Sequence, residues 1–229
     1  MNLKLFIFVL LISISDLSHA LYGARTITPS QFSAVVTIHL NDPENPEIDS
    51  FCSGVLVAAD KVLTTGHCVE VMATEVYDQW NKFTYEPNLI KIKVGNVKYA
   101  VVDVSIAASY TEAVGYEGED LALITLKKPL TNVTPIKVVA PSTLKAGMAV
   151  SMVARGKVAD TTITSVKNYS GNTVIFTDGT KAGTCEGDSG GALLVKKGEV
   201  YFLAGLLSAQ AEGCYKQTGV SIFPRTTGW

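Results

Sequence analysis

The chain contains 229 residues and is nearly neutral, with 19 Lys or Arg against 21 Asp or Glu and a formal net charge of −2 at pH 7. This balance, without any run of basic residues, gives no indication of binding to nucleic acid or to an anionic membrane. Hydrophobic residues make up 47% of the sequence, so the chain can bury a sizeable core in one or two domains.

The first 20 residues have the layout of a signal peptide. Lys4 precedes an apolar run over residues 5–14, and the small residues Ser18 and Ala20 precede the expected cleavage point. The apolar run is too short for a comfortable membrane span. We therefore expect a secreted protein that begins at Leu21 and has no membrane association once the signal is removed.

Residues 21–229 have a β-like pattern, in which short runs rich in Val, Ile and Thr alternate with Gly, Pro, Asn and Asp. The strands that this pattern predicts lie at 34–40, 55–58, 90–94, 100–106, 121–126, 149–154, 161–166 and 201–207. Repeated short strands at this spacing favour an all-β sandwich or barrels over a parallel α/β fold.

Cysteine usage agrees with export to an oxidising compartment. The four cysteines permit three pairings, and an even number indicates two disulfides; they are Cys52, Cys68, Cys185 and Cys214. A zinc site is the competing interpretation, but no Cys-x-x-Cys pair exists and only His39 and His67 follow residue 20. The sequence therefore predicts no metal site.

A glycine-rich motif surrounds one serine shortly after Cys185, in the order Gly187-Asp188-Ser189-Gly190-Gly191. A serine hydroxyl is a weak nucleophile and needs a nearby base, together with backbone N–H groups that stabilise the charge formed on the substrate oxygen. Glycines allow the backbone to bend so that its amides face one point. The competing interpretation is a glycine-rich turn whose serine has no catalytic role. The longer motif and the preceding cysteine disfavour it.

Two further motifs supply a base and an acid. Thr65-Gly66-His67-Cys68 follows the apolar pair Val62 and Leu63, and Glu119-Asp120-Leu121 places an acid at the start of an apolar run. Alone, His67 would be interpreted as a surface or core histidine whose hydrogen bonds are made within the fold, as we interpret His39. Asp120 alone would be interpreted as a strand cap. Together, a His, an Asp and a Ser, each in its own motif, predict a triad for nucleophilic catalysis.

With these motifs, together with Phe51-Cys52-Ser53-Gly54 before the histidine, residues 21–229 resemble the chymotrypsin and trypsin family of serine proteases (peptidase S1). The resemblance implies an all-β fold of two antiparallel six-stranded β-barrels, at about 21–131 and 132–229. The active site then lies in the cleft between the barrels and needs neither a cofactor nor a metal.

The resemblance also implies roles for individual residues. His67, Asp120 and Ser189 form the catalytic triad, and the amides of Gly187 and Ser189 form the oxyanion hole. Disulfides join Cys52 to Cys68 and Cys185 to Cys214. The substrate pocket has its floor at Gly183 and includes Ser208, Gln210 and Gly219. Because no acid lies at the floor, we expect small or medium uncharged side chains in this pocket.

Leu21-Tyr22-Gly23-Ala24 resembles the family's activating N-terminus, whose amine pairs with the aspartate beside the nucleophile, here Asp188. Leu21 directly follows the expected signal-peptide cleavage point, so we expect signal removal itself to create the activating amine. Cleavage after Arg25 is the rival hypothesis, but a chain that begins at Thr26 would be too short to reach Asp188 in this register.

We therefore expect a secreted serine endopeptidase that acts as a monomer on protein or peptide substrates through an acyl-enzyme intermediate, with protein protease inhibitors as further partners. One alternative is a catalytically silent relative that acts as a binding protein, although its usual mark, a lost triad residue, is missing. Another is an esterase, which the order His, Asp, Ser and the lack of alternating helix patterns disfavour.

Overall fold

The computed structural model describes residues 21–28, 30–41, 52–70, 84–107, 119–169 and 171–208, and the backbone of strand 219–222. The fold is all-β, as the sequence predicts. Apart from strands, the described residues form only two short 3₁₀ turns, η1 (Gly66–Cys68) and η2 (Pro141–Thr143). None of the described segments is a helix with the length and hydropathy needed to cross a membrane.

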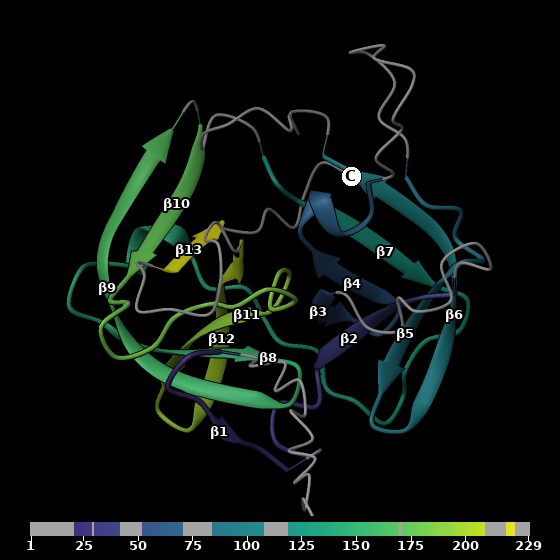
Figure 1. The fold of residues 1–229 in the computed structure, drawn as a ribbon, viewed down its shortest axis with the longest axis horizontal. Coiled ribbons are helices and arrows are strands. Elements are labelled where there is room, and N and C mark those ends of the chain that lie inside the picture. Colours follow the sequence, from purple (N-terminus) through teal and green to yellow (C-terminus); the bar gives the residue numbers. More distant parts are fainter. Residues whose placement is uncertain are drawn as a thin grey trace, which may run out of the picture.

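The first half of the chain closes into a six-stranded antiparallel barrel, with strand order β2-β3-β4-β7-β6-β5. It lies on the right in Figure 1. Its strands are β2 (Val35–Leu40), β3 (Cys52–Ala58), β4 (Lys61–Thr64), β5 (Ile90–Val94), β6 (Val97–Ile106) and β7 (Ala122–Leu126).

The second half forms another ring of six antiparallel strands. The sheet order β9-β10-β13-β12-β11-β8 returns to its first strand because β8 also pairs with β9, and the short β1 (Arg25–Thr26) pairs with β9 as well. The six strands are β8 (Ala149–Ala154), β9 (Lys157–Tyr169), β10 (Asn172–Thr177), β11 (Ala192–Lys197), β12 (Val200–Leu207) and β13 (Gly219–Ile222). The predicted fold of two six-stranded barrels is therefore confirmed.

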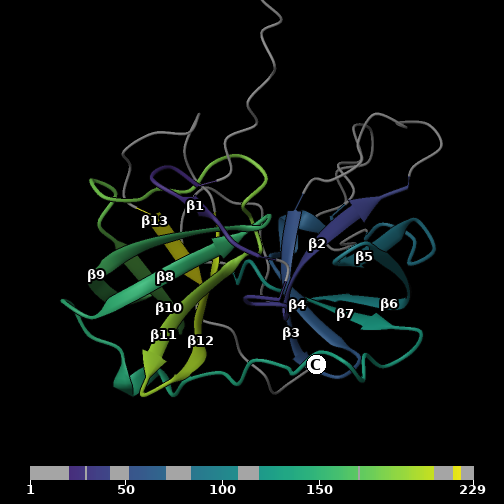
Figure 2. The same ribbon diagram turned by 90° about the horizontal axis from the view of Figure 1, so that it is seen from below.

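Each barrel buries its own apolar core, and a third core joins the two. Side chains alternate along a strand, so one face of each strand points inward. Fully buried side chains fill the first interior at Ile38, Ile92 and Ile124, and the second at Met152, Ile163 and Leu193. A separate cluster contains Val55 and Leu63 of the first barrel with Val153, Leu194 and Leu206 of the second. This shared cluster holds the barrels side by side (Figures 1 and 2).

The strands predicted from the sequence are all present, and the differences concern their ends and their number. β3 begins at Cys52 rather than at residue 55, and β9 extends over Lys157–Tyr169 rather than 161–166. The strands at β1, β10, β11 and β13 were not predicted, and β4 was indicated only by its apolar pair Val62 and Leu63. β11 is buried over its first four residues, so it lacks the alternation that marks a strand with one solvated face.

The barrels also meet at the serine motif. The backbone N–H of Ser53 in β3 donates a 2.7 Å hydrogen bond to the carbonyl oxygen of Ser189. Gly190 follows with a φ of +75°, and a Cβ atom there would overlap the carbonyl oxygen of Ser53 and Oγ1 of Thr64. Only glycine allows this approach of the second barrel to the first.

Replacing Gly190 tests this close contact, and Gly147 provides the matched control. Gly147 has a similar φ of +86°, but a Cβ there would meet nothing within 4 Å. We expect Gly147→Ala to lower the free energy of unfolding by about 1 kcal/mol through backbone strain alone. Gly190→Ala should lower it by about 3 kcal/mol or more, because overlap adds to the same strain. Urea unfolding measures both, and equal losses would contradict the overlap.

Candidate active site

A short turn at the end of β4 presents His67. Thr64 donates through Oγ1 to the carbonyl oxygen of Ser53 at 2.8 Å, which fixes the end of β4 against β3. Thr65 Oγ1 then lies 3.1 Å from Sγ of Cys68, across the single turn of η1. Gly66 and Cys68 are buried while His67 lies between them with 38% of its side chain exposed. The turn therefore directs the imidazole outward from a rigid base.

The disulfide between Cys52 and Cys68 closes this turn onto β3, with Cα atoms 6.0 Å apart. The predicted pairing of these two cysteines is therefore present. The bridge spans a sequence separation of 16, which corresponds to about 3 kcal/mol of stabilisation if chain entropy dominates. It anchors η1, and with it His67, to the first barrel.

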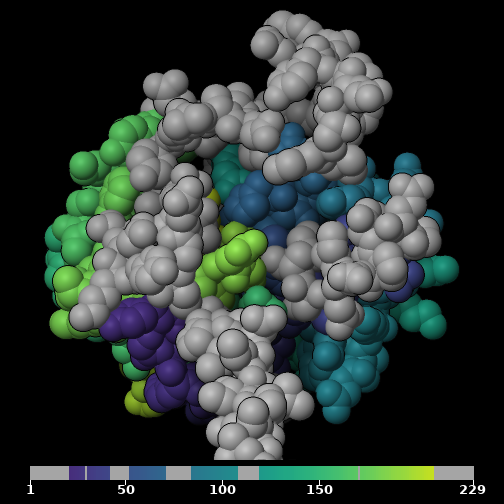
Figure 3. All heavy atoms as spheres, in the orientation of Figure 1, coloured from purple at the N-terminus to yellow at the C-terminus, as the bar shows by residue number. Residues whose placement is uncertain are grey.

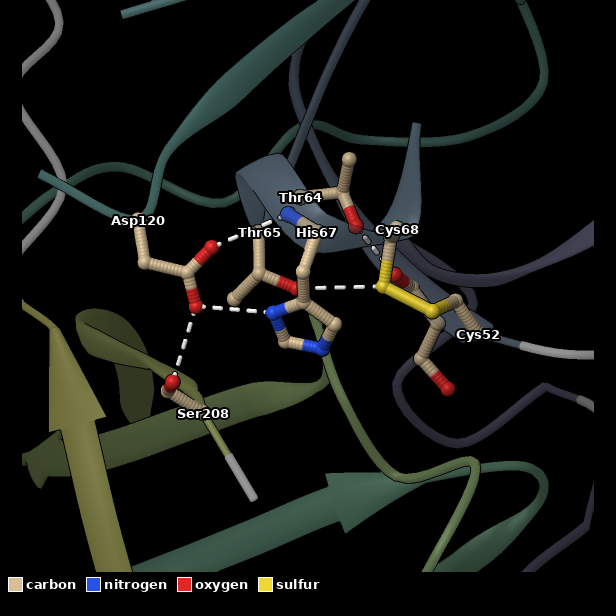
Figure 4. The surroundings of a disulfide bond; sticks show 8 residues. Cys52, Thr64, Thr65, His67, Cys68, Asp120 and Ser208 are labelled. Atoms are coloured by element: carbon tan, nitrogen blue, oxygen red, sulfur yellow. Dashed lines mark hydrogen bonds and ion pairs between the residues drawn. A yellow bond between two sulfur atoms is a disulfide. The ribbon is translucent and has the colours of Figure 1, made fainter. Parts of the chain in front are cut away.

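Asp120 accepts three hydrogen bonds from two parts of the chain (Figure 4). The backbone N–H of His67 donates to Oδ1 at 3.0 Å, and Nδ1 of His67 lies 2.9 Å from Oδ2. Oγ of Ser208, at the end of β12, donates to Oδ2 at 2.8 Å. In Figure 4 the other ring nitrogen of His67 points away from Asp120. The carboxylate therefore fixes the ring and leaves its far nitrogen available.

The pair shifts both pKa values toward the charged forms. Burial opposes protonation of His67, but the hydrogen bond and negative charge of Asp120, aided by Glu70, outweigh it and raise the pKa of His67 above its usual 6.5. Burial likewise opposes ionisation of Asp120. The hydrogen bonds and charge of His67, with the hydroxyl of Ser208, nevertheless lower the pKa of Asp120 below 3.8. The arrangement can hold an imidazolium ion at moderate pH.

Ser189 lies in the turn between Cys185 and β11, next to the first barrel. Its carbonyl oxygen accepts from Ser53, and the N–H of Gly190 donates to Leu207 at 2.8 Å. Oγ of Ser189 is not hydrogen-bonded to Nε2 of His67 within the described part of the chain. Such contacts are commonly long in a protein without substrate and shorten when substrate binds.

Three backbone donors of this turn have no partner among the described residues: the N–H group of Glu186, which is exposed to solvent, and those of Gly187 and Ser189, which are not exposed. Gly187 has a φ of +84°, a left-handed conformation that favours glycine. Backbone N–H groups near a protein interior are almost always paired. The N–H groups of Gly187 and Ser189, which flank Asp188, are therefore available to an acceptor from outside the chain.

Asp188 is fully buried beneath this turn. Its Oδ2 accepts from the backbone nitrogen of Leu21 at 2.9 Å and from that of Cys185 at 2.7 Å, whereas its Oδ1 has no hydrogen-bond partner. Burial raises the pKa of Asp188 to about 6, although the two N–H donors and the charge of Arg155 oppose the rise. In the intact chain Leu21 follows Ala20, so its nitrogen is a neutral amide. Among the described residues, the carboxyl group thus has no cation in direct contact.

The residues predicted for the substrate pocket are only partly described. Gly183 is buried, and its backbone pairs with that of Tyr22 through hydrogen bonds of 2.8 and 3.3 Å. Gly219 begins β13, where it pairs with Thr177 of β10. Gln210 lies outside the described residues. Cys185 is disulfide-bonded, and its predicted partner Cys214 also lies outside them.

One cluster of potential metal ligands occurs in the described segments, formed by Cys52, His67 and Cys68. The disulfide occupies both sulfur atoms, so these residues cannot act as thiolate ligands. Sequence reasoning assigned no role to Ser53 or Arg155, yet both contact the serine turn. Arg155 lies against Gly187, and a pattern search could not have found this because the contact joins two turns that are far apart in the sequence.

A family model described as Trypsin matches residues 22–227, nearly the whole of the chain. The match includes the three sequence motifs and both barrels.

The effect of Asp120 on His67 can be measured by NMR titration of ring-labelled histidines. In the unsubstituted protein the pKa of His67 should lie above 6.5. In Asp120→Asn it should fall below that of the unsubstituted protein, because burial remains while the favourable charge is lost. Asp103→Asn, an exposed change on β6, is the matched control and should leave the value unchanged. A His67 pKa that does not respond to Asp120→Asn would contradict this coupling.

Proposed function

Because the chain belongs to the trypsin family of serine peptidases, we propose that it is an active endopeptidase with His67, Asp120 and Ser189 as its catalytic triad. Ser189 attacks the carbonyl carbon of the scissile bond while His67 accepts its proton. His67 then donates that proton to the leaving amine, which leaves an acyl group on Ser189. Water, activated by His67 in the same way, releases the acyl group. Asp120 orients the ring and stabilises its charged form.

The observation that carries this proposal is the pair of unpaired N–H groups at Gly187 and Ser189. In acyl transfer the carbonyl oxygen becomes an anion, and fixed donors that are already in position lower the barrier to its formation. In a glycine-rich turn without a catalytic role, these N–H groups would be expected to form hydrogen bonds within the protein. Their availability beside the triad serine supports an oxyanion hole.

Leu21 and Asp188 form the activation pair in this proposal. Signal-peptide cleavage before Leu21 would convert its neutral amide into an ammonium group at the same position, 2.9 Å from Oδ2 of Asp188. A buried carboxylate gains several kcal/mol from such a partner, so the ion pair would stabilise the serine turn. We further propose that the protein is secreted, that residues 21–229 form the peptidase domain, and that proteins or peptides are its substrates.

Covalent labelling with a fluorophosphonate tests the catalytic proposal directly. This reagent reacts with serines that are activated by a neighbouring base and an oxyanion hole, so we expect one label per chain, at Ser189. Ser189→Ala should abolish labelling, and mass spectrometry identifies the modified residue. A folded chain that begins at Leu21 but takes no label would instead favour a binding protein that has kept the triad residues without their activity.

The activation pair predicts a difference between a chain that begins at Leu21 and one that retains Ala20. With Ala20 retained, the raised pKa of Asp188 favours its neutral form in the folded state. The contribution of Asp188 to the free energy of unfolding is then greatest below about pH 3.8. It falls by about 3 kcal/mol as the pH rises through about 6. The ammonium of a Leu21-started chain should remove most of this fall.

Urea unfolding at pH 4 and pH 7 measures the difference, because groups common to both chains cancel. Asp188→Asn in the chain that retains Ala20 is the control and should remove the extra fall with pH. Fluorophosphonate labelling should be faster in the Leu21-started chain. Identical pH profiles and labelling rates in the two chains would exclude this mode of activation.

A further inference from the structure

The turn between β8 and β9 holds an arginine in a strained conformation. Ala154 and Lys157 form the last cross-strand pair, so Arg155 and Gly156 are the two residues of a tight hairpin turn. Their φ values are +45° and +72°. Asn, Asp or Gly normally occupies the first position of such a turn, because other side chains disfavour a positive φ. A strained residue beside a candidate site indicates that its side chain has a specific role.

The side chain of Arg155 reaches the backbone that carries one of the unpaired donors. A Cβ atom built on Gly187 would lie 2.5 Å from Nη1 of Arg155, 3.4 Å from its Cζ and 3.6 Å from its Cδ. The guanidinium therefore covers the Cα of Gly187, where any other residue would place a side chain. This contact brings a positive charge next to the position proposed for the scissile carbonyl.

Arg155 also lines a hollow of about 250 Å³ where the two barrels meet. Thr37 of β2 and Lys93 of β5 contribute from the first barrel, and Val153 and Arg155 from the second. None of the lining residues is acidic, and neither Lys93 nor Arg155 has a carboxylate partner within the described part of the chain. The hollow therefore offers an anionic group two cations that have no carboxylate in direct contact, although the charge of Arg155 also acts on Asp188.

Two of its lining residues, Thr37 and Arg155, connect the hollow to the serine turn, Arg155 through its contact with Gly187. Thr37 is the cross-strand partner of Ser53, whose N–H binds the carbonyl oxygen of Ser189. None of the lining residues belongs to the predicted pocket at Gly183 and Ser208. In Figure 3 the green atoms of the second barrel meet the blue atoms of the first near the centre of the face. The hollow shares no lining residue with that pocket, so a side chain in the hollow would belong to a different residue of the peptide.

We propose that Arg155, with Lys93, binds a carboxylate side chain within the first three residues after the scissile bond, and thus selects acidic leaving-group sequences. The inference rests on the proposed peptidase function. Arginine suits this role because its planar guanidinium can donate two parallel hydrogen bonds to one carboxylate. Lys93 adds a second positive charge from the opposite barrel.

A peptide library tests this selectivity. Residues before the cleaved bond are randomised, and each of the next three positions carries either Glu or Gln. The protein should cleave the Glu peptides about tenfold faster, in kcat/KM, at one of these positions. Arg155→Gln should bring the ratio close to one, and Arg155→Glu should favour Lys at the same position. Arg25→Gln, an exposed arginine on β1, is the matched control and should keep the preference for Glu.

Labelling with the fluorophosphonate separates selectivity from a collapsed site, because the reagent has no peptide on its leaving-group side. Arg155→Gln should still be labelled at Ser189. If that variant does not fold, salt provides a second test, since 1 M NaCl should reduce the Glu to Gln ratio of the unsubstituted protein. The proposal is wrong if the protein shows no preference for Glu, or if Arg155→Gln or high salt leaves the preference intact.

If the unsubstituted protein takes no label and cleaves nothing, the peptidase function fails but the carboxylate site is still measurable. The affinity of Ser189→Ala for the same peptide pairs does not depend on catalysis. We expect the Glu peptides to bind about tenfold more tightly than the Gln peptides, and Arg155→Gln in this background to remove the difference. Equal affinities would overturn the carboxylate site.

Discussion

The backbone hydrogen bond from Ser53 to the carbonyl oxygen of Ser189 is the constraint on which the candidate site depends. It fixes the serine turn of the second barrel against the same β3 strand that carries Cys52, and the Cys52–Cys68 bridge fixes His67 to that strand. The approach is close enough that Gly190 has no room for a Cβ atom. His67 and Ser189 are thus positioned by one strand, although they belong to different barrels.

Two carboxyl groups near this contact, partly buried Asp120 and fully buried Asp188, have opposite electrostatic environments. Asp120 accepts three hydrogen bonds and faces an imidazole, so its pKa is lowered despite burial. Asp188 accepts two backbone N–H groups on one oxygen and none on the other, so burial dominates and its pKa is raised to about 6. The first group is suited to stabilise a positive charge that forms during reaction. The second can be stabilised in its charged form by an added cation, which a free amine at Leu21 would supply.

Arg155 connects these electrostatics to substrate recognition. It lies against Gly187, whose N–H group is unpaired, and its charge favours ionisation of Asp188 while its side chain also lines the hollow between the barrels. A cation in this position can influence both the stability of the serine turn and the choice of leaving group. The two effects differ in kind, because the first changes the rate for every substrate whereas the second changes the rate for acidic substrates relative to neutral ones.

The sequence by itself determined the all-β class, most strands, and the three motifs that contain His67, Asp120 and Ser189, because strand periodicity and local motifs are encoded in neighbouring residues. The tertiary structure alone decided which distant groups meet. The contacts of Ser208 with Asp120, Ser53 with Ser189 and Arg155 with Gly187 join segments that are far apart in the sequence, and their geometry depends on how the strands and the two barrels pack. β11 also escaped prediction, since burial on both faces removes the alternation from which a strand is recognised.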